Sequence, residues 1–191
     1  MDRVLTIPNV LTLGRLALVP TFLILLEGLR WREALVVFFI AGLTDALDGA
    51  IARLTHTKTT LGAYLDPAAD KLLLVSAFIA LGFMQAVPRW LTVVVLSRDA
   101  MLILGYFLLF MMTQRTMEIQ PTVIGKLGTF LQLSSVGFIL IDRVRTGFLD
   151  QNVLQGLFFV TAAVTAIAGL QYAIRGLVWL QRQGPSEGAP R

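Results

Sequence analysis

Residues 45–70 read Asp45-Ala-Leu-Asp48-Gly49-Ala-Ile-Ala52-Arg53 and, after residues 54–61, Gly62-Ala-Tyr-Leu-Asp66-Pro-Ala-Ala-Asp70. Asp45 and Asp48 are three apart and Asp66 and Asp70 four apart, so each pair shares one face of a helix. The short connection predicts that the two helices are antiparallel neighbours. We therefore expect four carboxylates to converge. Because like charges repel and burial of charge is costly, they must hold cations or share protons.

The rest of the chain is far more apolar than a soluble protein, with 56% hydrophobic residues and a mean hydropathy of +0.76. Most of its apolar runs have room for the roughly 20 residues of a bilayer crossing, the third when counted from Gly62. The runs lie near Val10–Leu26, Ala34–Ala52, Leu72–Val87, Trp90–Met112, Thr122–Ile141 and Val153–Trp179. The first run contains Arg15 and lacks a small-residue cleavage site, so it is not a cleavable signal peptide. We predict an all-α integral membrane bundle of six transmembrane helices with a short amphipathic N-terminal segment.

Charge and cysteine content narrow the class of function. The pI near 10 comes without a basic stripe or motif, which favours an anionic membrane surface over nucleic acid. Lysine and arginine are more frequent on the side that holds the 54–61 connection and both termini, which predicts that this side is cytoplasmic. The absence of cysteine excludes disulfides, thiolate nucleophiles and zinc–thiolate sites. We expect one domain over 1–183 and a disordered tail over 184–191.

Two other interpretations of the aspartates compete with a metal site. A transporter could use them as a proton or ion relay, but relays usually spread acids along a path of broken helices in paired halves. Here all four lie in one hairpin, and the chain shows no internal repeat. Ion pairing with Arg53 and Lys71 could explain one or two of the acids, but two cations cannot neutralise four anions. A metal-centred enzyme is therefore favoured.

The motif resembles the signature of the CDP-alcohol phosphotransferases, with every fixed position and both gaps matched. The resemblance extends along the chain: Ile7–Arg15 is similar to the amphipathic beginning of the phosphatidyltransferase branch, and Asp66–Lys71 to its extended motif. It implies six transmembrane helices, with the site at the cytoplasmic ends of the second and third.

The resemblance also implies the chemistry. An alcohol attacks the β-phosphate of a CDP-linked lipid, here CDP-diacylglycerol, and CMP is released. Two divalent cations, Mg²⁺ or Mn²⁺, suit such a displacement because they neutralise the attacking and leaving oxygens, and they prefer carboxylate ligands. By resemblance, Asp45, Asp48 and Asp66 are the principal ligands. Asp70 is the candidate catalytic base and also contacts a metal.

Further positions are expected to bind the CDP-lipid. Gly49 and Ala52 lie one turn from the first aspartates, where missing bulk admits the nucleotide; tight helix packing is the alternative. Arg53 can fork onto the diphosphate, and Gly62 begins the second half of the motif. Asn9, Thr12 and Arg15 fall three apart. A substrate-binding role is open for all three, with Arg15 the best candidate, and local capping is the alternative for Asn9 and Thr12.

The acceptor site is expected at Arg98 and Lys126, because basic residues at these places face the acceptor in the resembling enzymes. A structural Arg98–Asp99 ion pair and a snorkelling Lys126 are the alternatives. The overall pattern resembles bacterial phosphatidylglycerophosphate synthases, so we expect glycerol 3-phosphate as acceptor. Ala41–Asp45 and Ser97–Ile103 look more like cardiolipin synthases, which makes phosphatidylglycerol the alternative. We further expect a homodimer, surrounded by membrane lipids in a bacterial inner membrane, with the active site facing the cytoplasm.

Overall fold

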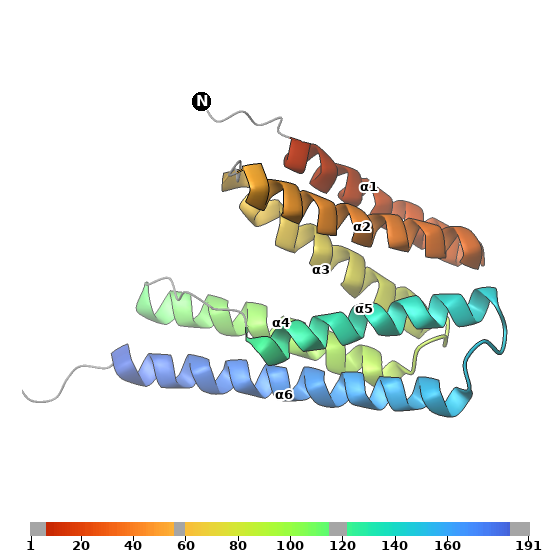
Figure 1. Ribbon diagram of the computed structural model, residues 1–191. Coiled ribbons are helices and arrows are strands. Elements are labelled where there is room, and N and C mark those ends of the chain that lie inside the picture. Colours follow the sequence, from red (N-terminus) through yellow and green to blue (C-terminus); the bar gives the residue numbers. More distant parts are fainter. Residues whose placement is uncertain (1–6, 56–59, 115–121, 184–191) are drawn as a thin grey trace, which may run out of the picture.

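The computed structural model describes residues 7–55, 60–114 and 122–183. Side chains at 7–11, 45–55, 60–68, 70, 110, 113, 182 and 183 are outside the description. The described residues form six α-helices (Figure 1). They are α1 (Ile7–Glu27), α2 (Trp31–Thr55), α3 (Thr60–Phe83), α4 (Arg89–Thr113), α5 (Val123–Val144) and α6 (Gln151–Gln183). The all-α prediction with six helices is confirmed.

Membrane crossing is supported for half of these helices. Within the described residues, the segments long and apolar enough to cross a bilayer are Arg89–Leu109, Val123–Val144 and Gln151–Gln181, in α4, α5 and α6. Lys71–Phe83 of α3 is a shorter apolar segment.

The third apolar run ends as a helix earlier than predicted, at Phe83 instead of Val87. Gln85 adopts the left-handed conformation (φ 55°), and the backbone N–H of Ala86 donates to the carbonyl of Leu81 at 2.9 Å. Ala86 and Val87 are nevertheless buried in the core. Their apolar character therefore serves the packing of a turn, which hydropathy cannot distinguish from one more helical turn.

A local charge pair lies at the start of α2. The Arg30 guanidinium donates to Glu33 in the first helical turn at 3.0 and 3.1 Å. A hydrogen bond from its own backbone N–H, and then the one from Arg30, lower the pKa of the Glu33 carboxyl. A negative side chain here also complements the positive end of the helix dipole.

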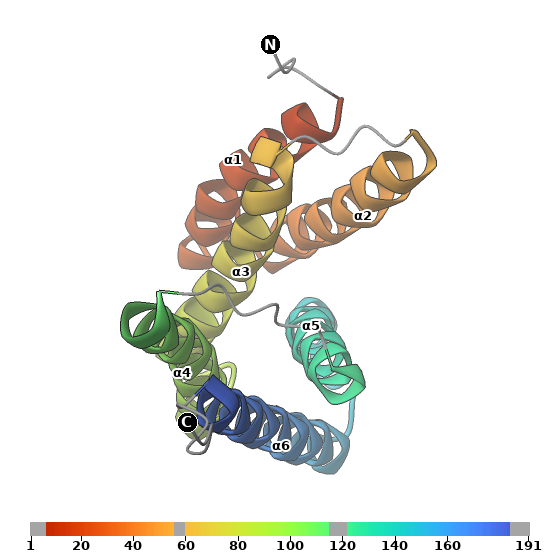
Figure 2. The ribbon, with the colours of Figure 1, turned by 90° about the vertical axis from the view of Figure 1, so that its left-hand side faces the viewer.

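The helices form two groups joined by a shared core. Figure 2 shows α1, α2 and α3 on one side and α4, α5 and α6 on the other. Helix α1 packs against α2 and α3, α6 packs against α4 and α5, and α3 and α5 connect the groups. Buried side chains from all six helices, including Phe22, Phe38, Phe78, Leu91 and Leu140, make one hydrophobic cluster. Because α4 and α6 run in the same direction, their C-terminal halves lie side by side at the end of the molecule that carries the α2–α3 connection (Figure 1).

Candidate functional site

The aspartate motif lies at one end of the molecule, divided between two antiparallel helices (Figure 1). The C-terminal turns of α2 carry Asp45, Asp48, Gly49, Ala52 and Arg53, and the N-terminal turns of α3 carry Gly62, Asp66 and Asp70. Figure 2 shows the two helix ends set apart, with α1 packed against both helices, so the prediction that α2 and α3 are direct neighbours is wrong for the described residues. The side chains of these eight residues lie outside the described part of the chain. Convergence of the carboxylates therefore stays a prediction.

The N-terminal candidates lie on α1. Thr12 and Arg15 are buried, at 2% and 1% exposure, and the side chain of Asn9 lies outside the described residues. Burial of an arginine on the helix that packs against both halves of the motif is costly unless it is paired. Its position agrees with a role near the motif, which stays a prediction.

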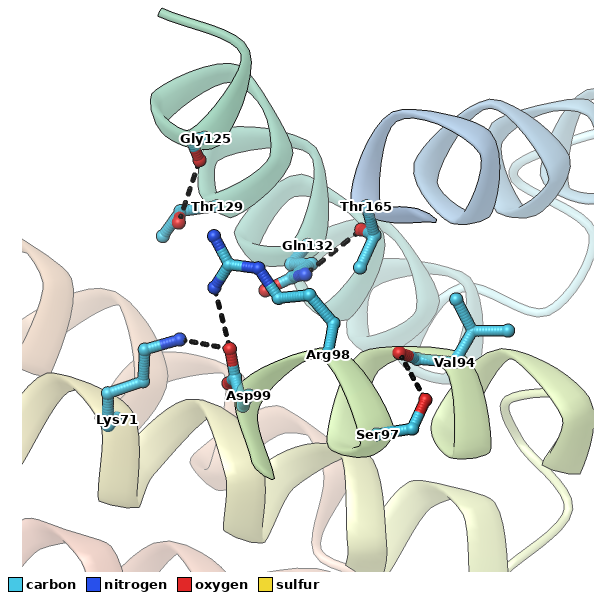
Figure 3. Close-up of polar contacts among 9 residues, drawn as sticks. All are labelled: Lys71, Val94, Ser97, Arg98, Asp99, Gly125, Thr129, Gln132 and Thr165. Carbon is cyan, nitrogen blue, oxygen red and sulfur yellow. Dashed lines mark hydrogen bonds and ion pairs between the residues drawn. The ribbon is translucent and has the colours of Figure 1, made fainter. Parts of the chain in front are cut away.

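Next to the motif, three charged side chains meet between α3 and α4 (Figure 3). Asp99 accepts through Oδ1 from Lys71 Nζ at 2.5 Å and from Arg98 NH1 at 2.6 Å. The Asp99 side chain is 5% exposed and Lys71 is 40% exposed, so Lys71 covers a buried carboxylate from the open side. We call Lys71, Arg98 and Asp99 the charged triad. The Arg98–Asp99 pair that the sequence left as an alternative is present, and Lys71 pairs with Asp99 of α4.

The charged triad is a strong local arrangement with one surplus positive charge. A carboxylate shared by two cations gives charge-assisted hydrogen bonds of about twice the strength of neutral ones. Lys71 follows Asp70 directly in the chain, so the same turn of α3 holds a motif aspartate and the link to Arg98. The arrangement can place a cation next to the motif, where an anionic substrate would be attracted.

Tyr172 of α6 contacts Arg98 and packs against the beginning of α5, the helix that carries Lys126. The Arg98 guanidinium lies 5.7 Å from the centroid of the Tyr172 ring, within the range of a cation–π contact. The Tyr172 hydroxyl accepts from the backbone N–H of Thr122 at 3.1 Å, just before α5. Lys126 lies in the first turn of α5 and is exposed, and its neighbour Gly125 packs so closely that an added Cβ would lie 2.8 Å from the Tyr172 oxygen.

Sequence reasoning did not identify Tyr172 or two polar pairs between α5 and α6. Gln132 donates to Thr165 at 3.0 Å, and the Ser135 and Thr161 hydroxyls are 2.9 Å apart, all buried between α5 and α6. These residues look like ordinary weakly polar positions in apolar helices. The available signal was their spacing: Gln132 and Ser135 are three apart, and Thr161 and Thr165 four apart, on facing helices.

Several buried polar atoms near Arg98 have no hydrogen-bond partner among the described residues. They are Arg98 Nε, Asp99 Oδ2 and Gln132 Oε1, and Figure 3 shows Arg98 pointing from α4 toward Gln132 and Thr129 of α5. Leaving such atoms unsatisfied costs about 1–3 kcal/mol each. Water or the hydroxyls of a bound substrate would recover that energy.

The metal prediction rests on the motif alone. Among the described side chains, no group of three histidine, cysteine, aspartate or glutamate residues could hold a metal ion. The donor set of the motif, four carboxylates, fits hard divalent cations such as Mg²⁺ or Mn²⁺.

Comparison with known proteins gives one family. The profile of the family described as CDP-alcohol phosphatidyltransferase matches residues 5–168. The chain is 33% identical to a probable cardiolipin synthase (CMP-forming) of Drosophila melanogaster, over 91% of this chain and 58% of that protein. It is 36% identical to the cardiolipin synthase (CMP-forming) of Homo sapiens, over 87% and 60%. It is 35% identical to a probable phosphatidylglycerophosphate synthase of Mycobacterium tuberculosis, over 92% and 83%. The chain thus spans about 60% of the length of these two cardiolipin synthases.

Proposed function

The chain belongs to the CDP-alcohol phosphatidyltransferase family, and from this premise we propose that it transfers the phosphatidyl group of CDP-diacylglycerol to the hydroxyl of an anionic glycerol-containing acceptor. The observation that carries the proposal is the family match over residues 5–168, together with the complete motif at one end of α2 and α3. In the bond exchange, the acceptor oxygen forms a bond to the β-phosphorus, the bond from that phosphorus to CMP breaks, and CMP leaves with the bridging oxygen.

Within this proposal each residue has a defined task. Asp45, Asp48 and Asp66 would hold two divalent cations, Mg²⁺ or Mn²⁺, which supply charge neutralisation at the phosphates when bound. Asp70 takes the proton of the acceptor hydroxyl. Arg53 binds the diphosphate, Gly49, Ala52 and Gly62 leave space for the nucleotide, and Asn9 and Thr12 border it. We further propose six membrane-spanning helices, with the site on the cytoplasmic side, and a homodimer.

Phosphatidylglycerol is the first candidate acceptor, which would make the product cardiolipin. In the charged triad Asp99 neutralises one of two cations, so a single positive charge is left near the motif. Phosphatidylglycerol carries one phosphodiester charge, whereas glycerol 3-phosphate is doubly anionic near neutral pH. The several relatives named cardiolipin synthase support the same choice.

Glycerol 3-phosphate, the acceptor expected from the sequence, is the second candidate. The relative named phosphatidylglycerophosphate synthase supports it, since the match covers 83% of that protein. The exposed Lys126 would supply the second positive charge that a phosphomonoester needs.

The test uses purified protein with CDP-diacylglycerol, Mg²⁺ and either acceptor, with CMP release measured and the lipid product identified by mass. Cardiolipin formation supports the first candidate, and phosphatidylglycerophosphate the second. Chelation should abolish turnover, and Mg²⁺ or Mn²⁺ should restore it; full turnover in excess chelator contradicts the metal site. Asp48→Asn should be inactive yet folded in detergent. Ion flux across vesicles without nucleotide would instead indicate a transporter.

A further inference from the structure

The C-terminal halves of α4 and α6 enclose a groove of about 750 Å³. Its walls are residues between Met101 and Met112 of α4 and between Tyr172 and Leu180 of α6. We call it the α4–α6 groove. Its volume lies within the roughly 300–1,000 Å³ of small-molecule binding sites. It begins beside Arg98, whose guanidinium packs on the Tyr172 ring, and is therefore continuous with the candidate acceptor site.

The lining of the groove fits a hydrocarbon chain. Met101, Leu108, Met112 and Leu177 are exposed apolar side chains on its walls. Both walls belong largely to segments long and apolar enough to cross a membrane, so in a bilayer Met101, Leu108 and Leu177 would face hydrocarbon. Along α4 the groove runs for about 16 Å at 1.5 Å per residue, close to the roughly 15 Å of one leaflet. One acyl chain matches that length.

One face of α6 adds polar groups to this apolar groove. Tyr172, Arg175 and Trp179 are three and four residues apart, so they share the helix face that lines the groove. Arg175 is exposed and has no ion pair within the described residues. A cation in apolar surroundings is stabilised by an anionic partner. Tyrosine and tryptophan are favoured at the level of lipid headgroups. The complementary ligand is an anionic phospholipid.

We propose that the α4–α6 groove binds the lipid acceptor, phosphatidylglycerol, with its phosphodiester on Arg175 and one acyl chain between the two helices. This assignment rests on the proposed function for the identity of the lipid. The assignment of an anionic phospholipid to the groove is supported independently by the apolar lining, the length of the groove and the charge of Arg175.

Trp179 allows binding to be measured without turnover. The chain has three tryptophans, and Trp31→Phe with Trp90→Phe leaves Trp179 as the only one. Phosphatidylglycerol with brominated acyl chains, titrated at low mole fraction into detergent micelles, should quench Trp179 fluorescence saturably. Brominated phosphatidylcholine should need at least tenfold more lipid. Arg175→Gln should remove this preference, because a charge-assisted contact to phosphate is worth about tenfold or more in affinity.

Gly105 permits the groove to be filled without a clash. It lines the groove, and an added Cβ would have no neighbour within 4 Å. Gly105→Leu should abolish saturable quenching and raise the KM for phosphatidylglycerol about tenfold, while the KM for CDP-diacylglycerol stays unchanged. Gly156→Leu is the matched control, since Gly156 on α6 also has no neighbour within 4 Å of an added Cβ and lies outside the groove. It should bind and turn over like the unmodified protein.

The outcomes separate the groove from the proposed function. Unchanged quenching in Gly105→Leu, or equal quenching by both brominated lipids, overturns the groove. Absence of quenching, with cross-linking of Gly105→Cys to a second copy, also overturns it and assigns the groove to a dimer contact. Selective quenching that Gly105→Leu removes, without cardiolipin formation, supports the lipid site and overturns the proposed acceptor.

Discussion

At the candidate site, Asp99 of α4 holds Lys71 of α3 and its own neighbour Arg98 in place. Its carboxylate is almost fully buried, and its Oδ1 atom accepts from both Lys71 and Arg98. A buried carboxylate is tolerated only when cations and hydrogen bonds compensate its lost hydration. The same contacts fix Lys71 on α3 beside the motif and Arg98 on α4 beside Tyr172. Position and charge at the site therefore depend on one side chain.

Asp99→Asn should lower the stability of the protein by about 3 kcal/mol, because Lys71 and Arg98 keep their charges without a counter-charge. For a chain of this length that corresponds to a fall of roughly 6–12 °C in the midpoint of thermal unfolding, measured in detergent. The Lys71→Gln/Asp99→Asn double variant removes one of the two unpaired cations and should recover part of the loss. A midpoint for Asp99→Asn equal to that of the unmodified protein would show that the charged triad does not stabilise the fold.

Arg98→Ala and Lys126→Ala test the acceptor assignment at the same scale. If both side chains contact acceptor phosphate, each variant should raise the acceptor KM by about tenfold or more, with little change in the KM for CDP-diacylglycerol. A larger effect of Lys126→Ala with glycerol 3-phosphate than with phosphatidylglycerol is expected, because only the former carries a second charge. Steady-state kinetics with one substrate held saturating provides the measurement. Unchanged acceptor KM values in both variants would place the acceptor elsewhere.

At the scale of the helix, hydropathy and spacing predicted where helices exist, and local backbone chemistry decided where they end. All six apolar runs are helices, yet the third stops at Phe83 because Gln85 turns left-handed. No glycine marks that position, and Pro88, the next stop signal, lies five residues beyond Phe83, so the sequence did not place the helix end at Phe83. The motif residues were found because their types and spacing are specific. Tyr172 was missed because its importance arises only when α4, α5 and α6 come together.

Gln85→Gly should stabilise the protein by about 0.5–1 kcal/mol. The left-handed conformation costs a non-glycine residue roughly 1–2 kcal/mol, whereas glycine adopts it freely but loses more backbone entropy on folding. Gln155→Gly is the matched control, an exposed glutamine inside α6, where the same substitution should destabilise by about 0.5–1 kcal/mol. Thermal unfolding midpoints should therefore move in opposite directions. If both variants lose stability, Gln85 does not adopt a costly left-handed conformation at the end of α3.

For the whole molecule, the number of helices that cross the bilayer determines which side the motif faces. Helices α4, α5 and α6 qualify by length and composition, while α1, α2 and α3 form the other group of the same six-helix structure. These two groups share one hydrophobic core, so they are expected to lie at the same depth. If all six cross, both termini and the connections between α2 and α3 and between α4 and α5 face one side. The turns near residues 28, 86 and 146 then face the other, and the lysine and arginine bias makes the first side cytoplasmic.

The absence of cysteine makes this arrangement directly measurable, because each introduced cysteine is the only one in the chain. Lys58→Cys should be labelled by a membrane-impermeant maleimide only in inverted membrane vesicles. Thr146→Cys, between α5 and α6, and Leu29→Cys, between α1 and α2, should be labelled only in right-side-out vesicles or intact cells. The reason is that charged reagents cannot cross the roughly 30 Å hydrocarbon layer that an α-helix of about 20 residues spans. If Lys58→Cys and Leu29→Cys are labelled from the same side, α2 does not cross the bilayer. The motif would then lie on a helix resting at the membrane surface, which would require a different route for the proposed lipid substrates.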